Sequence, residues 1–371
     1  MKVIIAGDYC PWERVAKQFA QGNYSALDAL RPVMAEADYR IVNLECPILH
    51  GSEKPIIKSG PHMHADTQAL EALKGIGVEC VTLANNHFRD FGDEGVLNTL
   101  SELSAYKIDY VGGGSNLKDA SAVLYKQIGK ETLAIVNCCE HESSIATDDH
   151  CGSNPLNPIQ QYYAIQEARQ KADYVLVIVH GGVEHYQLPT PRMQETYRFF
   201  IDTGADAVVN HHQHCYSGYE EYKGKPIFYG LGNLCFDRSK RNSIWNEGYV
   251  LDLTLSQKGS NYILIPYHQC DAEPKVLLFN EEEKKAFDKS IKELNAIIDN
   301  PDELEAKYEE LKRSTRMKYR AYIEPYKSKL MRYLHRKHLL PSFMRRKYVL
   351  IHNLIQCESH REQLLDAINI K

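Results

Sequence analysis

Several common features are missing from this chain of 371 residues. No window approaches 18 consecutive apolar residues, so the sequence offers no candidate for a membrane-spanning helix. The chain opens on a strand-like run, VIIAG, without the basic, apolar and small-residue regions of a secretory signal. Internal repeats and low-complexity segments are also missing. We therefore expect a globular protein of the cytoplasm that is at most peripheral to a membrane.

The ten cysteines include no C-x-x-C pair, and several lie inside apolar strand-like runs such as CVTLA. This placement favours buried free thiols over a disulfide framework. Three of them, Cys10, Cys46 and Cys215, stand beside candidate metal ligands and are the exceptions to follow.

Charge is divided unevenly along the chain, although the net charge of −5 is mild. Residues 301–371 hold 16 Lys and Arg against 9 Asp and Glu, which is +7 and leaves −12 for the preceding 300 residues. From 1 to 275, β-rich runs alternate with helix-like spacers, which predicts a layered α/β domain. Three late runs, PIFYGLGNL, GYVLDLTL and NYILIPYH, alternate more closely and favour antiparallel strands. From 281 to 371, helical periodicity broken by prolines predicts a basic helical appendage.

Five apolar runs reach side chains of the kind that bind metals. VIIAGD ends at Asp8, RIVNLE at Glu45 and VTLANNH at His87, while YVLVIVHGG reaches His180 and AVVNHHQH carries His212 and His214. The carboxyl ends of strands in a twisted α/β sheet line one rim, so residues far apart in sequence meet there. Oxygen and imidazole ligands without thiolates suit Mn, Fe or Zn. A metal-dependent hydrolase is therefore the leading hypothesis.

Each candidate has a role that its chemistry allows. Asp8 and Glu45 offer anionic oxygens, although either could be a helix cap or a loop acid. Asn86 can offer a neutral carbonyl oxygen while His87 faces a substrate. Asp90 can hold the His87 ring in the form that a general acid needs. The alternative is a capping Asn beside a surface His.

In the NHHQH segment, an extended backbone would project His212 and His214 to the same side and turn His211 away to pack elsewhere. Substrate contacts are sought on loops that follow or lie near the strand ends, where each residue could equally be an ordinary loop residue. These candidates are Arg14, His62, His64, Glu140, His141, Glu142, Glu184, His185 and Asn233. Arg14 could grip a phosphate with a bidentate fork, and GLGN at 230–233 could add backbone donors.

Taken together, these motifs resemble a known family. They are GD at 7–8, NLE at 43–45, ANNH with the following Asp90 and Gly92, VHGG, PTPRMQETYRFFIDTGADAVVNHHQH, and GKPIFYGLGNLCFD at 224–237. The resemblance is to the CapA family of poly-γ-glutamate capsule-synthesis proteins, within the calcineurin-like metallophosphoesterase superfamily. It covers roughly residues 1–270 and leaves the helical tail outside.

The resemblance implies a four-layer α/β/β/α sandwich with a site for two divalent metal ions. By matching position, the implied ligands are Asp8, Glu45, Asn86, His180, His212 and His214, and His87 is the implied catalytic histidine. The superfamily usually opens with Asp-x-His, whereas this chain has Asp8-Tyr9-Cys10. One metal therefore lacks its usual histidine unless Cys10 or a distant side chain replaces it. Glu45 stands where many members have Asp, as is normal for CapA-like sequences.

Three function classes stay open. A phosphomonoester or phosphodiester hydrolase, tied by the resemblance to capsule or exopolysaccharide synthesis, comes first because a two-metal cage suits phosphoryl transfer. The others are an amide- or polymer-directed activity in capsule assembly and a noncatalytic metal-binding scaffold.

The tail adds an expectation about partners. Residues 312–347 hold 13 Lys and Arg with a single acid, Glu324, and several interleaved tyrosines. This pattern predicts contact with a membrane surface or an anionic glycan, unless the segment is a solvated basic face packed on the acidic domain. Nucleic acid is disfavoured, because no recognition motif is present and the main domain is acidic.

Overall fold

The computed structural model describes residues 1–238 and 243–368. The chain forms two compact units, Met1–Leu304 and Glu305–Lys371. No helix in the described ranges combines the length and the apolar character that crossing a membrane requires.

In the described ranges, the first unit contains two large β-sheets. The eight-stranded sheet has the order β16-β15-β14-β1-β2-β3-β4, and β13 also pairs with β1. Its strands are β1 (Lys2–Tyr9), β2 (Tyr39–Leu44), β3 (Cys80–Thr82), β4 (Asp109–Val111), β13 (Asn233–Cys235), β14 (Glu247–Thr254), β15 (Asn261–Gln269) and β16 (Val276–Leu278). The six-stranded sheet has the order β11-β12-β10-β9-β7-β6. Its strands are β6 (Leu124–Ile128), β7 (Glu131–Cys139), β9 (Tyr174–His180), β10 (Ala207–His211), β11 (Tyr219–Tyr222) and β12 (Lys225–Phe228).

Strands that are apolar on both faces create the layers. Along β1, Val3 and Ile5 enter the core between the two sheets, while Ile4 enters the core on the outer face. Along β9, Ile178 faces the same central core and Val177 enters a third core on the far side. Because alternate side chains point to opposite faces, each such strand serves two cores. The two sheets thus lie face to face, with one core between them and one core on the outer face of each sheet.

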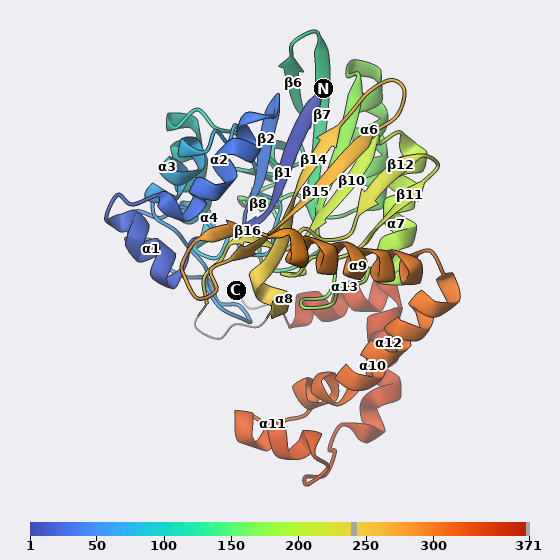
Figure 1. Ribbon diagram of the computed structural model, residues 1–371. Helices are drawn as coiled ribbons and strands as arrows, with labels where there is room; N and C mark the ends of the chain where they lie inside the picture. Colours follow the sequence, from blue (N-terminus) through green and yellow to red (C-terminus); the bar gives the residue numbers. More distant parts are fainter. Residues whose placement is uncertain (239–242, 369–371) are drawn as a thin grey trace. The chain divides into compact units, whose positions relative to one another are not determined.

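Helices close the two outer cores, as Figure 1 shows with α1 to α4 on one flank of the paired sheets and α6 and α7 on the other. The first set is α1 (Glu13–Ala20), α2 (Arg31–Ala35), α3 (Gln68–Gly75) and α4 (Gly92–Ala105). The second set is α6 (Pro158–Lys171) and α7 (Pro191–Thr203). Helix α7 begins where Thr190 Oγ1 accepts a hydrogen bond from Met193 N, with Pro191 in its first turn. The predicted four-layer α/β/β/α arrangement is confirmed.

The late β runs agree with their sequence-based prediction in part. Strands β14 and β15 are antiparallel as predicted, whereas PIFYGLGNL divides into β12, which is antiparallel to β11 and parallel to β10, and β13, which is parallel to β1. The first unit also extends past residue 275. Helix α9 (Glu281–Ile298) buries Phe287 and Ile291 in the central core, so its apolar face belongs to that unit.

The second unit is helical. It contains most of α10 (Pro301–Ile323), followed by α11 (Lys329–Arg336), α12 (Tyr348–Gln356) and α13 (Glu358–Ala367). Smaller elements of the chain are β5 (Gly113–Gly114), β8 (Gly152–Ser153), α5 (Leu117–Ala120) and α8 (Ser243–Asn246).

All ten cysteines are free thiols and nine of them are buried, as their positions in apolar runs predicted.

Candidate metal centre

The carboxyl ends of parallel strands from both sheets meet at one place and carry the candidate ligands. Asp8 lies near the end of β1, Glu45 follows β2, and Asn86 follows β3 by four residues. His180 ends β9, and His212 and His214 follow β10. All six side chains are buried. The carboxyl ends of these strands therefore bring the six side chains together at one rim of the sheets.

Ligand atoms gather in two groups that share Glu45. One group is Glu45, His180 and His212, and the other is Asp8, Glu45 and His214. Within each group the atoms that could bind a metal all lie within 4.8 Å of one another. Glu45 Oε1 is 3.5 Å from His180 Nε2 and 3.7 Å from His214 Nε2, so one oxygen faces both groups.

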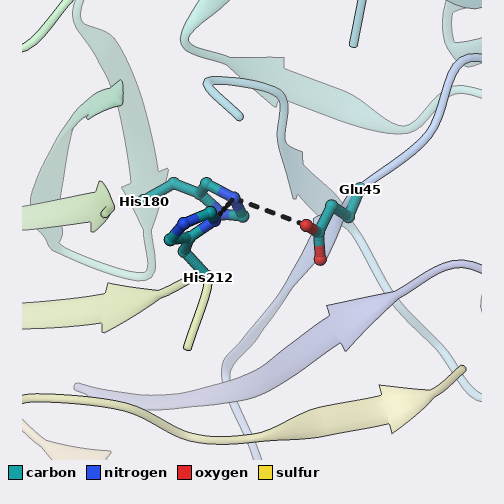
Figure 2. A group of neighbouring side chains, drawn as sticks. All are labelled: Glu45, His180 and His212. Carbon is teal, nitrogen blue, oxygen red and sulfur yellow. Dashed lines mark hydrogen bonds and ion pairs between the residues drawn. The ribbon is translucent and has the colours of Figure 1, made fainter. Parts of the chain in front are cut away.

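Figure 2 shows the first group, with the two imidazoles side by side and the Glu45 carboxylate directed at His180. His180 Nε2 also lies 3.1 Å from His212 Nδ1 and 3.0 Å from Asn86 Oδ1. Three further candidate donor atoms thus lie within 3.5 Å of His180 Nε2. Imidazole nitrogens, a carboxylate and an amide oxygen form a donor set for a borderline divalent ion.

Glu45 provides the test of whether a metal fits. Its side chain is fully buried, and neither carboxylate oxygen has a hydrogen-bond partner in the described part of the chain. Burial, followed by the nearby charges of Asp8 and Glu184, raises the pKa of Glu45 well above its usual value. A buried carboxylate without partners is strongly destabilising unless a cation compensates it. The residues present fit a bound divalent ion.

Asp8 is held in place by the strands around it. Asn43 Nδ2 donates to Asp8 Oδ1 at 2.7 Å, and the backbone N–H of His212 donates to Oδ2 at 3.1 Å. Burial alone would raise the pKa of Asp8, but the neighbouring His211, His180 and further imidazoles bring it well below the usual range. Asp8 is thus an anionic ligand at neutral pH.

The imidazoles of His180 and His214 are kept neutral, which is the form that binds metals. Burial, followed by the charge of His212, lowers the pKa of His180 well below its usual value. Burial also lowers the pKa of His214 to about 4. His214 Nδ1 lies 2.9 Å from Asn233 Oδ1, which orients its ring and leaves Nε2 to the site.

The NHHQH segment reaches the site by a different backbone path from the predicted one. Strand β10 ends at His211, and His212 and His214 have φ of 93° and 54° in the left-handed region. A tight loop, rather than an extended strand, therefore presents both rings. His211 does not turn away either, because its Nδ1 lies 3.3 Å from Asp8 Oδ1. Strain of this kind is common at functional sites.

His87 and Asp90 lie together as the sequence suggested, and a third residue joins them. His87 Nδ1 is 2.7 Å from Asp90 Oδ2, and the N–H of Met63 donates to the same oxygen. Lys58 Nζ forms an ion pair with Asp90 Oδ1 and lies 3.2 Å from His87 Nδ1. The Lys58 side chain is only 5% exposed. The buried ion pair of Lys58 and Asp90 thus holds the carboxylate that fixes the His87 ring.

A cavity of about 220 Å³ opens onto the centre, and its wall includes Asn86, His87 and His214. Two of the predicted substrate residues, Glu142 and Glu184, also line it. The wall also contains aromatic and basic side chains, namely Trp12, Lys58, Phe236, Arg238 and Trp245. His185 packs its ring 5.8 Å from Trp245.

Other predicted substrate residues have protein partners. Arg14 forms a bidentate ion pair with the fully buried Asp237 and donates to backbone carbonyls of 270–272. Glu140 pairs with Arg192 and accepts from the N–H of Gly182.

Three more predicted substrate residues lie apart from the cavity wall. His62 Nε2 contacts the carbonyl of Ile56, and the His64 ring packs edge-on to Trp12 and Phe91. His141 is exposed. Asn233 serves His214, as described above.

The position of the missing histidine is filled by packing residues. The Tyr9 hydroxyl donates to the carbonyl of Ala69, away from the ligands. Burial raises the pKa of the Cys10 thiol well above its usual value, which disfavours a thiolate ligand. In the described ranges, neither group of ligand atoms includes a cysteine.

Sequence reasoning missed Asn43 and Lys58. Asn43 precedes Glu45 by two residues and pairs in register with Asp8, so the NLE motif held a usable signal. Lys58 lies in a loop without periodicity, and nothing local marks it.

The comparisons with known proteins agree with these observations. The family described as "Bacterial capsule synthesis protein PGA_cap" matches residues 2–238, a range that contains every candidate ligand. Capsule biosynthesis protein CapA of Bacillus anthracis is 33% identical over 215 residues, which are 56% of this chain and 52% of that protein. PGA biosynthesis protein CapA of Bacillus subtilis (strain 168) is 31% identical over 238 residues, which are 63% of this chain and 62% of that protein. The chain thus spans between about half and three-fifths of the length of these two relatives.

Among solved structures, a 5′-nucleotidase from Candida albicans SC5314 superposes with a TM-score of 0.44 at 8% identity, over 85% of this chain and 57% of that one. A likeness so distant says nothing about individual residues. The family match, by contrast, covers well over half of the chain and includes the six-stranded sheet, strands β1 to β4 and β13 of the eight-stranded sheet, and the buried ligand groups. This protein is a member of the PGA_cap family of bacterial capsule synthesis proteins.

Proposed function

We propose that this protein is a metal-dependent hydrolase of the phosphoesterase type that acts in the biosynthesis of a capsule, exopolysaccharide or poly-γ-glutamate. The observation that carries the proposal is the unpartnered, fully buried Glu45 carboxylate, one oxygen of which faces both groups of ligand atoms. A carboxylate in this position can bridge two cations and offset their mutual repulsion. The names of the CapA relatives motivate the biosynthetic role.

Two bound divalent ions would supply a water of lowered pKa and would neutralise charge on a phosphoryl oxygen. Asp8, Glu45, Asn86, His180, His212 and His214 would hold them. Asn43 would orient two of these ligands. Its Nδ2 donates to Asp8 Oδ1 and lies 3.3 Å from His180 Nδ1, which leaves His180 Nε2 to face the other ligand atoms.

His87 is the residue that would move a proton. Its Nδ1 faces Asp90, so Nε2 is the nitrogen left to serve a leaving oxygen in the cavity. Asp90 is itself held by Lys58 and by a backbone N–H, which keeps the imidazole in one orientation. A positioned general acid of this kind contributes about 10²- to 10⁴-fold to a rate.

The cavity wall suggests the kind of substrate. Trp12, Phe236 and Trp245 give it apolar, planar surfaces, and the cationic Lys58 and Arg238 stand in the same wall as the acidic Glu142 and Glu184. With cations bound at the centre to attract the phosphate, such a wall would suit a phosphoester whose leaving group has an apolar face.

The test begins with metal content. After purification with Mn²⁺ and removal of free metal, elemental analysis should find about two ions per chain. A panel of phosphomonoesters and phosphodiesters, set beside glutamyl polymers, then defines the reaction class. His87→Ala should lower phosphoester hydrolysis about 10²- to 10⁴-fold with metal content unchanged. His50→Ala is the matched control, because His50 is a half-exposed histidine that pairs with Glu102.

Unchanged hydrolysis in His87→Ala would refute the role of His87, and cleavage of the glutamyl polymers alone would replace the phosphoesterase by an amide-directed enzyme.

A noncatalytic metal-binding scaffold is the second candidate. The specific observation in its favour concerns Cys10, which stands at the histidine position of the Asp-x-His pattern. In the described ranges, neither group of ligand atoms includes a cysteine. Fewer than one bound ion per chain, together with no hydrolysis across the panel, would favour the scaffold over the enzyme.

A further inference from the structure

A second cavity, of about 370 Å³, lies entirely within the helical unit that begins at Glu305. Its polar wall comes from α10, the end of α11 and the segment that leads into α12. The residues are Arg320, His335, His338, Ser342, Arg345 and Tyr348. This helical unit lies outside residues 2–238, which match the family, so the family match does not account for the cavity.

The two arginines are available to a ligand. In the part of the chain that the structure describes, neither Arg320 nor Arg345 lies within 4 Å of a carboxylate, whereas Lys312 on the same helix pairs with Glu309. The Arg320 guanidinium stacks over the Tyr348 ring, 5.4 Å from its centre, which orients the group without neutralising it. Both arginine side chains are exposed.

Glu324, an acid at the end of α10, already has partners. The Glu324 carboxylate accepts hydrogen bonds from the Ser342 hydroxyl, the N–H groups of Phe343 and Met344, and the Tyr348 hydroxyl. These bonds tie the 342–348 segment, and with it Tyr348 and Arg345, to the end of α10. The acid thus builds the cavity wall instead of competing for the arginines.

His335 is the second and independent sign of a ligand. It is only 4% exposed and lines the cavity, and its Nδ1 has no hydrogen-bond partner among the described residues. Its Nε2 lies 3.8 Å from Glu324 Oε1, too far for a hydrogen bond. A buried polar atom left without a partner is destabilising, which favours a ligand that completes it.

We propose that this cavity binds a phosphate group. Two guanidinium forks and two imidazoles line the cavity, and a phosphate offers them three acceptor oxygens and a charge near −2. A single planar carboxylate would satisfy one fork and leave the other groups unpaired. The phosphate can belong to a soluble molecule or to a lipid headgroup, which present the same chemistry here.

The test titrates the full-length protein, held in excess chelator at constant ionic strength, with inorganic phosphate in a calorimeter. The chelator removes metal from the centre in the first unit, so that phosphate binding there does not contribute. Arg345→Gln should weaken phosphate binding roughly tenfold, as loss of one charge-assisted pair does. Arg346→Gln is the matched control, because this neighbouring arginine does not line the cavity, and it should change affinity less than twofold. Arg320→Gln, on a different helix, should reproduce the Arg345→Gln loss.

Equal losses in Arg345→Gln and Arg346→Gln, or binding that does not saturate, would overturn the proposal and leave only a diffuse basic surface. Tighter binding of a carboxylate such as citrate than of phosphate would also overturn it. Vesicles of phosphatidylcholine with phosphatidate identify the source. Arg345-dependent binding to these vesicles assigns the phosphate to a lipid, and binding of inorganic phosphate alone assigns it to a soluble molecule. Arg345→Gln should leave phosphoester hydrolysis unchanged, so this result is independent of the proposed enzyme.

Discussion

Replacing Glu45 by glutamine should stabilise the metal-free protein and weaken the metal-loaded one. Glu45 is fully buried, its two oxygens have no hydrogen-bond partner in the described ranges, and Asp8 and Glu184 add repulsion. Glutamine keeps the shape and removes the charge. Since an unsatisfied buried polar group is destabilising by ~1–3 kcal/mol, and more when charged, we expect Glu45→Gln to add about 2 kcal/mol to the free energy of unfolding in chelator.

Metal should reverse the order of the two proteins. A ligand at one hundred times its dissociation constant stabilises the folded state by about 2.7 kcal/mol. The wild type should gain this stabilisation from Mn²⁺, whereas Glu45→Gln has lost the anionic oxygen that both ligand groups share. Urea denaturation at pH 7.5, in chelator and in saturating Mn²⁺, measures both free energies.

The matched control is Glu220→Gln. Glu220 is also buried, but it accepts hydrogen bonds from Arg198 and from the Tyr229 hydroxyl, so its loss should destabilise the protein equally with and without metal. If Glu45→Gln lowers the stability of the metal-free protein, or if Mn²⁺ stabilises wild type and variant alike, the assignment of Glu45 as a bridging ligand is refuted.

Three further predictions concern the frame around the site. Gly7→Ala should destabilise the protein by about 3 kcal/mol and lower its metal content, because a Cβ at Gly7 would meet the Gly232 carbonyl oxygen at 1.9 Å beside Asp8; an unchanged melting temperature would contradict this close approach. Asp237→Asn should lower the free energy of unfolding by about 3 kcal/mol, because Arg14 loses its ion-pair partner, and elemental analysis should find the same metal content as in wild type. Loss of hydrolysis without loss of stability would instead indicate that Arg14 binds the substrate. The hydrogen bonds that Glu53 accepts outweigh the effect of its burial and lower its pKa to about 2, so its contribution to folding stability is present above pH 4.5 and is lost as the pH falls toward 2. Wild type should therefore be more stable than Glu53→Gln by about 2 kcal/mol at pH 7, and denaturation at a series of pH values should show this difference vanish over that window. A difference that stays constant with pH would refute the prediction.

The sequence was informative wherever structure follows from periodicity. Runs such as VIIAG and YVLVIV are apolar at every position, and only a strand with a core on each face uses such a run. The rim followed from the same reasoning, since parallel strands deliver their carboxyl ends to one edge. Asp8, Glu45 and His180 could be placed there without knowing the strand order.

Non-local pairing limited the rest. The PIFYGLGNL run was expected to be antiparallel, but only the pairing of β12 with β11 is; β12 is parallel to β10 and β13 to β1, because alternation within a run does not specify its neighbours. Arg14 lies on a loop near a strand end, as a substrate residue would. Its partner Asp237 is 223 positions away, and no local pattern connects the two. Lys58 was missed for the same reason, because its partner Asp90 lies across a loop.

The two ligand groups are not equivalent, and the departure at Asp8-Tyr9-Cys10 explains why. The group of Glu45, His180 and His212 has Asn86 Oδ1 3.0 Å from His180 Nε2, so four donors are at hand. The other group has three, Asp8, Glu45 and His214, and in the described ranges Tyr9 and Cys10, which follow Asp8, add no fourth donor. The His211 imidazole also lies close to Asp8, with its Nδ1 3.3 Å from Asp8 Oδ1. Each group has three anionic or imidazole donors, and only the first has a fourth donor, the Asn86 amide oxygen, so we expect the first position to hold its ion more tightly than the second. A hydrolysis that required both ions would therefore depend on the Asp8 side, where the ligand set has three donors instead of four.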